Sequence, residues 1–384
     1  MSQTKAQLLE GTAAENVTVD NIVTTSVNGG QLSNRNRVIN GAMIVNQRSS
    51  TYSATGEEYL LDRFNHRTGS SFNFDTTTTQ DSSAPDGFTK SLKITPDSTQ
   101  TPSGSHNGMI ATLLEADTLI GFASGTSSAK KFVLSFYAKS ASQNNNHQYS
   151  VQLSKKNSGG TFYYQNRSFT VTSSWQRFTI AFPADTSNNI ITGNGEGLRI
   201  LWHLAAGPDD IASAVTSWTS SNGNHAVTGQ SNFMDNTSNE FYLTGVQLEA
   251  SDADVATDFE HISFAEELKK CQRYFYTSSR WMGGSRGSST SRSFILDFGM
   301  RLTGSDVSSG TYTNSGTSGG DVVYIGSNAT RQESTVTANS FGVSSTSTAG
   351  SMQVGVVVGY GIGSGDNGIA TGLYVAGFTM DHEL

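Results

Sequence analysis

Residues 241–276 read FYLTGVQLEASDADVATDFEHISFAEELKKCQRYFY, and they divide the chain into two parts with strand-like sequence. Ser263 has the residue type of a helix N-cap, and Glu266 follows it at the spacing of a capping box. Apolar residues then recur at helical spacing, at Phe264, Leu268, Cys271 and Phe275. We therefore expect a short linking helix that packs along this apolar stripe against a β-domain or a neighbouring chain.

Cys271 is the single cysteine of the chain, so an intrachain disulfide cannot form. A thiol at this position could be reactive or could bridge two chains. Its place on the apolar stripe instead favours a small buried side chain. We therefore expect stability to come from packing within the chain and between chains.

On the N-terminal side, residues 38–249 alternate between apolar and polar side chains, as half-buried strands do. In the segment 199–204, Trp202 falls on the apolar face, whereas His203 falls on the other face. Clusters of Gly, Asn, Ser and Thr separate such segments and are typical of short turns. Many strands, short turns and almost no helix predict an all-β fold built as a large two-sheet sandwich.

On the C-terminal side, residues 281–384 predict a smaller β-sandwich with long turns rich in Ser and Gly. Its segment 354–361 reads VGVVVGYG. An open edge strand of this kind would invite aggregation. Burial of such edges between chains is one physical reason to expect a homotrimer.

Composition excludes several classes of protein. The net charge of −8 argues against nucleic-acid binding, because phosphates require a basic surface. No apolar run is long enough for a transmembrane helix, so we expect no membrane insertion. The 20 Phe and 13 Tyr residues indicate a packed core rather than a disordered chain. The N-terminus shows no signal peptide, which is typical of a protein made in a bacterial host cytoplasm.

Several motifs resemble those of a family of bacteriophage tail-fibre and related virion proteins. The strongest are GVQLE at 245–249 and the segment ATDFEHISFAEELKKCQRYF at 256–275. Three further stretches match in the same order: NRVINGAMIVNQRSS at 36–50, TSSWQRFTIAF at 172–182 and FTMDHEL at 378–384. EEYLLDRF at 57–64 also matches, with Phe64 where the family usually has Trp.

The resemblance implies a jelly-roll-like sandwich of the carbohydrate-binding-module type. It also implies four parts: 1–37 as an N-terminal attachment segment, 38–262 as the jelly roll, 263–280 as the linking helix and 281–384 as the C-terminal β-domain. The motif residues expected to have structural roles are Phe259, Glu260, His261 and Cys271. For His261 we expect a local hydrogen bond that fixes the turn into the helix.

Motifs for catalysis, cofactors and metals are weak. GSGDNG at 363–368 matches a dinucleotide-binding pattern, but strand-like sequence follows it, so we interpret it as a hairpin turn. Asp252, Asp254 and Asp258 lack the remaining ligands of a calcium loop. Acidic residues such as Glu57 and Asp210 lie in no recognisable glycosidase motif. We therefore expect no cofactor, no metal ion and no enzymatic activity.

Glycan binding requires an exposed aromatic face with polar groups beside it. The candidates lie in the C-terminal part: Trp281, Arg286, Arg292, Tyr312 and Tyr324. The alternative for Trp281 is packing between the helix and the last domain. Among the other tryptophans, Trp175 and Trp202 are expected in the core, and Trp218 is expected to anchor a loop.

These features together predict a bacteriophage tail fibre in the virion tail. We expect it to attach to other tail proteins through residues 1–37 and to adsorb to a bacterial surface polysaccharide. A fibre held in this way presents residues 281–384 to the host first, so the main receptor contacts are expected there. The alternatives are a structural virion component, such as a head fibre or tail connector, and a glycan-degrading depolymerase.

Overall fold

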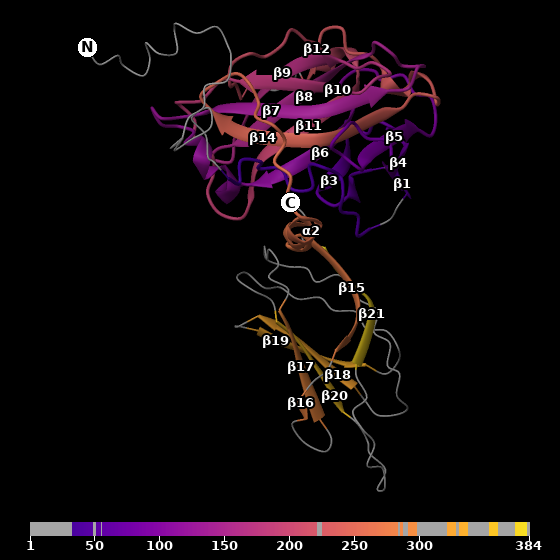
Figure 1. Cartoon of the computed structure of the whole chain (residues 1–384), viewed down its shortest axis with the longest axis vertical. Helices are drawn as coiled ribbons and strands as arrows, with labels where there is room; N and C mark the ends of the chain where they lie inside the picture. The colour runs from indigo at the N-terminus through magenta and orange to yellow at the C-terminus, as the bar shows by residue number, and fades with distance from the viewer. Residues whose placement is uncertain are drawn as a thin grey trace, which may run out of the picture.

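The computed structural model describes residues 33–48, 51–54, 56–220, 225–282, 285–286, 291–297, 321–327, 330–336, 353–359 and 373–381. Side chains are described as far as residue 275, except at 52–55. Within these residues the chain is almost entirely β-structure, which confirms the predicted all-β class (Figure 1).

Two antiparallel six-stranded sheets form a sandwich, as predicted. The first sheet has the order β1 (Thr51–Ala54), β4 (Thr76–Asp81), β5 (Ser91–Pro96), β14 (Phe241–Ser251), β7 (Lys131–Ser140) and β10 (Gln176–Phe182). The second sheet has the order β2 (Glu58–Leu61), β3 (Phe64–Gly69), β6 (Asn107–Glu115), β11 (Glu196–Ala206), β8 (Gln148–Lys156) and β9 (Phe162–Thr170). Strands that are neighbours in a sheet are therefore often distant in sequence.

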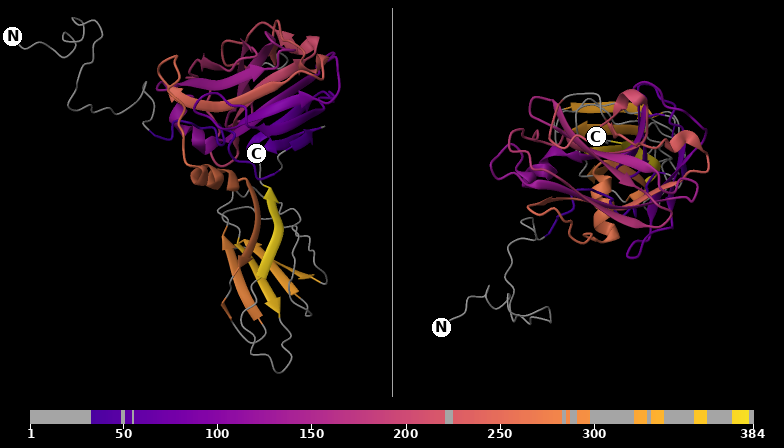
Figure 2. Two further views of the ribbon diagram at one scale, coloured as in Figure 1. Left: turned by 45° about the vertical axis from the view of Figure 1, so that its right-hand side comes forward. Right: turned by 90° about the horizontal axis from the view of Figure 1, so that it is seen from above.

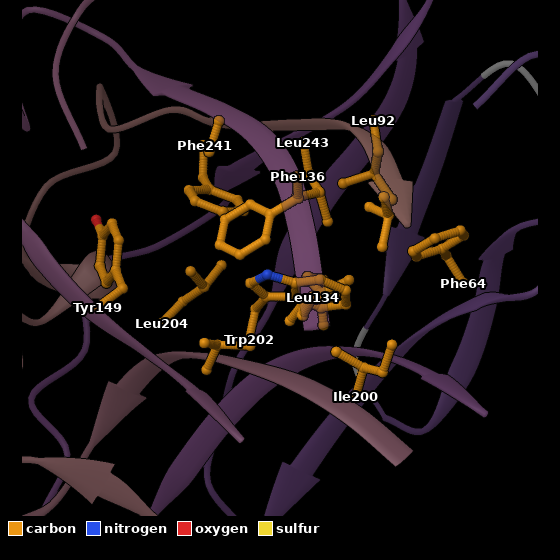
Figure 3. Close-up of a cluster of buried hydrophobic side chains, with 14 of the residues drawn as sticks. Phe64, Leu92, Leu134, Phe136, Tyr149, Ile200, Trp202, Leu204, Phe241 and Leu243 are labelled. Atoms are coloured by element: carbon orange, nitrogen blue, oxygen red, sulfur yellow. The ribbon is translucent and has the colours of Figure 1, made fainter. Parts of the chain in front are cut away.

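The core lies between these two sheets (Figure 3). Trp202 on β11 is fully buried, as predicted, and its ring meets that of Phe136 on β7 at 5.7 Å between centroids. Phe132 stacks on Phe122 at 4.0 Å, where the short 3-10 helix Ala116–Phe122 closes one end of the sandwich. Apolar side chains at every second position on both inner faces thus account for the stability of the sandwich.

The other two sandwich tryptophans differ from each other. Trp218 anchors its loop as predicted, because its indole N–H donates to the Pro183 carbonyl at 2.8 Å and its ring packs on Phe132. Trp175 was predicted in the core, but it is only half-buried beside Tyr242. The reason is its position just before β10, the edge strand of the first sheet, where the second sheet does not cover it.

The linking helix is α2 (Phe264–Gln272), and it carries the predicted capping box between Ser263 and Glu266. Cys271 forms no disulfide within the described residues and is fully buried, as predicted. The predicted stripe is wrong at its first residue, because Phe264 is 56% exposed. Two residues of the stripe, Cys271 and Phe275, are buried, and Glu267 and Tyr274 are buried beside them, so the buried face is rotated away from Phe264. The Asn40 N–H draws the Glu267 carboxylate inward and so sets this rotation.

The C-terminal strands follow α2 and extend away from the sandwich (Figures 1 and 2). β15 (Phe275–Met282) pairs with β21 (Leu373–Asp381). A five-stranded sheet contains β16 (Ser285–Arg286), β17 (Ser291–Asp297), β20 (Gln353–Gly359), β18 (Asp321–Ser327) and β19 (Thr330–Val336). Residues 363–368, interpreted above as a hairpin turn, lie outside the described residues.

Shorter elements complete the sandwich. Two 3-10 turns span Pro208–Asp210 and Phe233–Asp235. The short strands β12 (Ile211–Ala212) and β13 (Ala226–Val227) pair in parallel within the loop that follows β11. None of the described helices is sufficiently long and apolar to span a membrane.

Candidate functional site

Two groups of polar side chains stand out in the sandwich. The first, here called the seam, joins the N-terminal segment to β14 and α2 through Asn36, Asn40, Gln247, Glu249, Thr257, Glu260 and Glu267. The second, here called the groove, lies on the outer face of the second sheet. Their hydrogen bonding decides which of them is a binding site.

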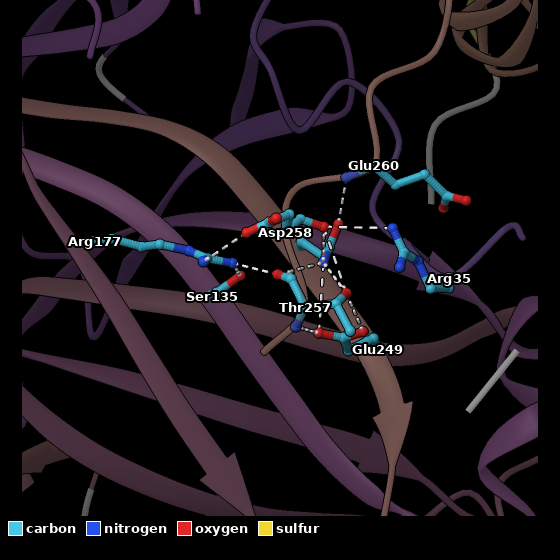
Figure 4. A network of polar contacts seen from close by, with 8 residues as sticks. Arg35, Ser135, Arg177, Glu249, Thr257, Asp258 and Glu260 are labelled. Atoms are coloured by element: carbon cyan, nitrogen blue, oxygen red, sulfur yellow. Dashed lines mark hydrogen bonds and ion pairs between the residues drawn. The ribbon is translucent and has the colours of Figure 1, made fainter. Parts of the chain in front are cut away.

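In the seam, the end of β14 holds the turn that precedes α2 (Figure 4). The backbone N–H and the hydroxyl of Thr257 each donate to the Glu249 carboxylate at 2.7 Å. The Glu260 N–H donates to the Gln247 side-chain carbonyl at 2.8 Å. Arg177 donates to the Thr257 carbonyl from β10. The GVQLE motif therefore holds the turn in place through these hydrogen bonds.

Asn40 is the centre of the other half of the seam. Its N–H donates to Glu267 at 2.7 Å, and its side-chain amide donates to the carbonyls of Val45 and Asp62, both at 2.9 Å. Its side-chain oxygen accepts from the Val45 N–H at 2.9 Å. Gly41 next to it is required by space, since a Cβ there would lie 2.1 Å from the Val246 carbonyl oxygen. The NGAM sequence thus fits against β14.

The predicted structural residues all belong to this region. Glu260 accepts from the Asn36 N–H at 2.9 Å, and Phe259 packs edge-on against Phe88. His261 packs its ring on Phe88 and Phe259, at 5.1 and 4.8 Å. Within the described residues it makes these ring contacts instead of the predicted hydrogen bond. Polar groups of the seam are paired with one another, so the region joins parts of the fold.

The groove is a hollow of about 210 Å³. Its lining residues come from the outer face of β3, β6, β8 and β11 and from the segments beside them: Glu57, Arg67, Thr68, Gly69, Asn107, Met109, Gln152, Ser154, Arg199, Leu201, His203 and His225. Alternation on β11 explains the placement, because the side chains next to inward Trp202 must point outward.

Strand register brings these residues into rows across the sheet. His203 on β11 lies opposite Met109 on β6, and Met109 lies opposite Arg67 on β3. Leu201 lies opposite Gln152 on β8 in the next row. Met109 and Leu201 belong to an outer apolar cluster and form the floor. The site thus combines an apolar floor with polar side chains around it.

The loop between β11 and β14 forms one wall. It is tied down on the outer face, where the Val227 N–H donates to the Ser150 hydroxyl at 2.8 Å and the Val215 N–H donates to the Asn166 side chain at 2.7 Å. This places the His225 ring 5.8 Å from that of His203, nearly parallel to it. Across the groove, Arg67 contacts Glu57.

Three buried polar atoms of the groove have no hydrogen-bond partner within the described part of the chain. They are Arg67 Nη1, Asn107 Oδ1 and His203 Nδ1. Burial, with His225 nearby, lowers the pKa of His203 to about 3, so this imidazole is neutral. Its Nε2 lies 2.9 Å from Gln152 Oε1, which places the proton on Nε2 and leaves Nδ1 as an acceptor.

A buried carboxylate fixes the orientation of the Asn107 side-chain amide. Its side-chain N–H donates to Asp210 at 2.6 Å, and burial raises the pKa of Asp210. The opposite atom, Oδ1, is therefore directed away from Asp210. Gly69 lies opposite Asn107 in the sheet, and a Cβ there would come within 2.5 Å of Oδ1. Glycine at this position leaves room for the amide.

The glycan-binding candidates from the sequence lie elsewhere. Arg286 and Arg292 are opposite each other on β16 and β17, and Tyr324 on β18 belongs to the same sheet. Trp281 is on β15 in the two-stranded sheet, opposite Tyr374. Tyr312 lies outside the described residues, as do the side chains of the other four. Their role in binding stays a prediction.

The groove was not predicted from the sequence. Its one visible signal was the polar face of 199–204, seen only as the face opposite Trp202. Arg67, Asn107 and Gln152 come from three other strands, and no local pattern joins them. The register between strands, which the sequence did not provide, brings them together.

No model of a known protein family matches the chain, and no curated protein matches it. Among solved structures, the family 11 carbohydrate-binding module of a cellulosomal cellulase of Clostridium thermocellum is similar, with 14% identity and a TM-score of 0.27 over 52% of this chain and 96% of that chain. A putative sugar-binding protein from Bacteroides thetaiotaomicron shows 10% identity and a TM-score of 0.31 over 56% of this chain and 100% of that chain.

The enzymatically active domain of tailspike protein 4 of bacteriophage CBA120 is also similar, with 12% identity and a TM-score of 0.28. The match covers 56% of this chain and 21% of that chain. Identities and TM-scores this low carry no argument about the function of the groove.

Proposed function

We propose that this protein binds a saccharide in the groove and does not cleave it. The observation that carries the proposal is the set of three buried polar atoms without a protein partner, Arg67 Nη1, Asn107 Oδ1 and His203 Nδ1, around an apolar floor. An unpaired buried polar group costs about 1–3 kcal/mol. A ligand that pairs with all three atoms removes this cost.

A sugar ring matches such a site chemically. Its C–H surface packs on apolar side chains, here Met109 and Leu201, and its hydroxyls donate to and accept from fixed polar groups. Gln152 and Ser154 add further hydrogen-bonding groups along the same face.

The finer proposal is a bacteriophage tail fibre that adsorbs to a bacterial surface polysaccharide. It is supported by the motifs at 245–249 and 256–275 that resemble tail-fibre proteins. In a homotrimer, three weak sites would act together, and multivalency raises the apparent affinity of linked sites by about 10²–10⁴. Sedimentation of the purified chain tests the trimer, and a stable monomer of 40.9 kDa would contradict it.

A glycan array with the full chain and two matched variants tests saccharide binding. Leu201→Gln puts an amide on the apolar floor and should weaken binding at least about tenfold, since it removes apolar contact. Ile120→Gln makes the same change at a side chain that is 69% exposed and away from the groove, and should bind normally. Equal binding by both variants would contradict the proposal, as would release of reducing sugar from the bound glycan.

A further inference from the structure

We propose that the saccharide taken by the groove is acidic and that its carboxylate binds the guanidinium of Arg67. This inference rests on the proposed function, because it names the class of glycan for the same site. The proposed function does not depend on this inference, because a neutral saccharide could also bind in the groove.

Arg67 is the cation with unused binding capacity. Its Nε and Nη2 lie 3.3 Å from the Glu57 oxygens, which is long for a charge-assisted hydrogen bond. The Glu57 side chain is 58% exposed, whereas that of Arg67 is 18% exposed. The remaining nitrogen, Nη1, is buried without a partner in the described chain. A ligand carboxylate can therefore displace Glu57 or pair with Nη1.

The second guanidinium of the groove is already occupied. Arg199 makes two contacts with Glu196, the longer of them 2.9 Å, and lies 4.2 Å above the centre of the Phe162 ring. Arg199 is therefore held by its own strand. Among the charged lining residues, Arg67 remains as the group that a ligand anion can bind.

The other two unpaired atoms complete the match. Asn107 Oδ1 and His203 Nδ1 are hydrogen-bond acceptors. Asn107 lies on β6, the strand next to that of Arg67, and His203 lies on β11, one strand further. Acceptors pair with hydroxyl donors, and a guanidinium pairs with a planar oxyanion. A sugar acid carries hydroxyls and a carboxylate on one ring, so it supplies both kinds of partner at once.

The charge of the whole chain makes the proposal specific. With a net charge of −8, the protein repels polyanions in general. Binding of an acidic glycan therefore requires a local cationic site rather than overall attraction. Removal of the Arg67 charge should abolish the preference for acidic over neutral glycans, and removal of one positive charge elsewhere should not.

The experiment measures binding of the full chain to paired oligosaccharides: glycans that contain sugar acids, their carboxyl-reduced neutral counterparts, and sulfated glycans. The wild-type protein should bind the acidic member of a pair at least about tenfold more tightly than the reduced member. Arg67→Gln should bring both to the level of the reduced member. Arg67→Lys should keep part of the preference, because it keeps the charge and loses the planar fork.

Lys131→Gln is the control, since it also removes one positive charge, from an exposed ion pair with Asp254. It should leave the preference unchanged, and melting temperatures should show that all variants fold. Equal binding of acidic and reduced members, or binding of sulfated glycans alone, would overturn the inference. If that binding still depended on the groove residues, the proposed function would stand. Binding of no glycan in a groove-dependent manner would overturn both.

Discussion

The seam and the groove are both polar, yet they differ in where their hydrogen bonds go. In the seam, Asn40, Gln247 and Glu249 bind other parts of the same chain. In the groove, Arg67, Asn107 and His203 each present a buried atom with no partner in the described chain. Fully paired polar residues stabilise a fold, whereas an unpaired buried polar atom requires an explanation, which the proposed saccharide supplies in the groove.

The largest effect is expected for the buried ion pair beneath the groove. Lys155 Nζ lies 2.9 Å from Asp185, with side chains that are 0% and 5% exposed. Asp185→Asn leaves the Lys155 ammonium buried without its counter-ion, and breaking such a pair costs about 3–5 kcal/mol. Chemical denaturation at neutral pH should show this loss. Saccharide binding by the folded variant should persist, because Lys155 faces the core side of β8.

The pH dependence of this effect has a definite sign. Burial alone would raise the pKa of Asp185, but hydrogen bonds from Lys155 and from the backbone N–H groups of Asn188 and Ser187 outweigh it and lower the pKa. The stabilisation is present above the unfolded pKa of about 3.9 and is lost as the pH falls through the lower folded value. The difference between wild type and Asp185→Asn should shrink in that range.

A matched variant at an exposed ion pair tests whether burial causes the large effect of Asp185→Asn. Asp252→Asn breaks an exposed pair with Lys130 at 2.6 Å and should cost about 0–1 kcal/mol. If it destabilises the protein as much as Asp185→Asn does, burial is not the source of the effect.

The next effect is expected in the seam. Asn40→Ala removes three side-chain hydrogen bonds at a fully buried position and leaves the Val45 N–H and two carbonyls without their partner. We expect a loss of about 2–3 kcal/mol in the free energy of unfolding, with unchanged saccharide affinity in the folded protein. Asn73→Ala, at an exposed position, serves as the control. A variant that unfolds normally but fails to bind would place the binding site in the seam.

Among the buried positions, the smallest effect is expected at Cys271. The thiol is fully buried on the helix face that meets the sandwich, so Cys271→Ser places a hydroxyl in an apolar position at a cost of ~1 kcal/mol. Thermal unfolding measures the change, and assembly should be unaffected. Mass spectrometry of an interchain disulfide would contradict the buried-thiol interpretation.

The sequence was informative about the seam for a physical reason. The capping box depends on two residues only three positions apart, so local spacing predicts it. Alternation likewise placed Trp202 in the core. The same patterns misplaced Phe264 and Trp175, because burial of these side chains depends on which distant segment covers them.

The groove could not be found in the same way. Arg67, Met109, His203 and Gln152 lie on four strands, and only the pairing order β3-β6-β11-β8 makes them neighbours. Alternation shows which face each residue occupies but not which strands stand side by side. The candidates in 281–384 follow from residue type within one segment and remain a separate prediction.

Hydrogen exchange of the full chain, with and without the saccharide found on the array, tests the central claim most directly. If the saccharide occupies the groove, amides of β6 and β11 around Asn107 and His203 should exchange more slowly in the complex. Amides of the seam at 245–251 and those of residues 281–384 should not change. Slower exchange confined to 281–384, with β6 and β11 unaffected, would show that recognition lies in the C-terminal part and not in the groove.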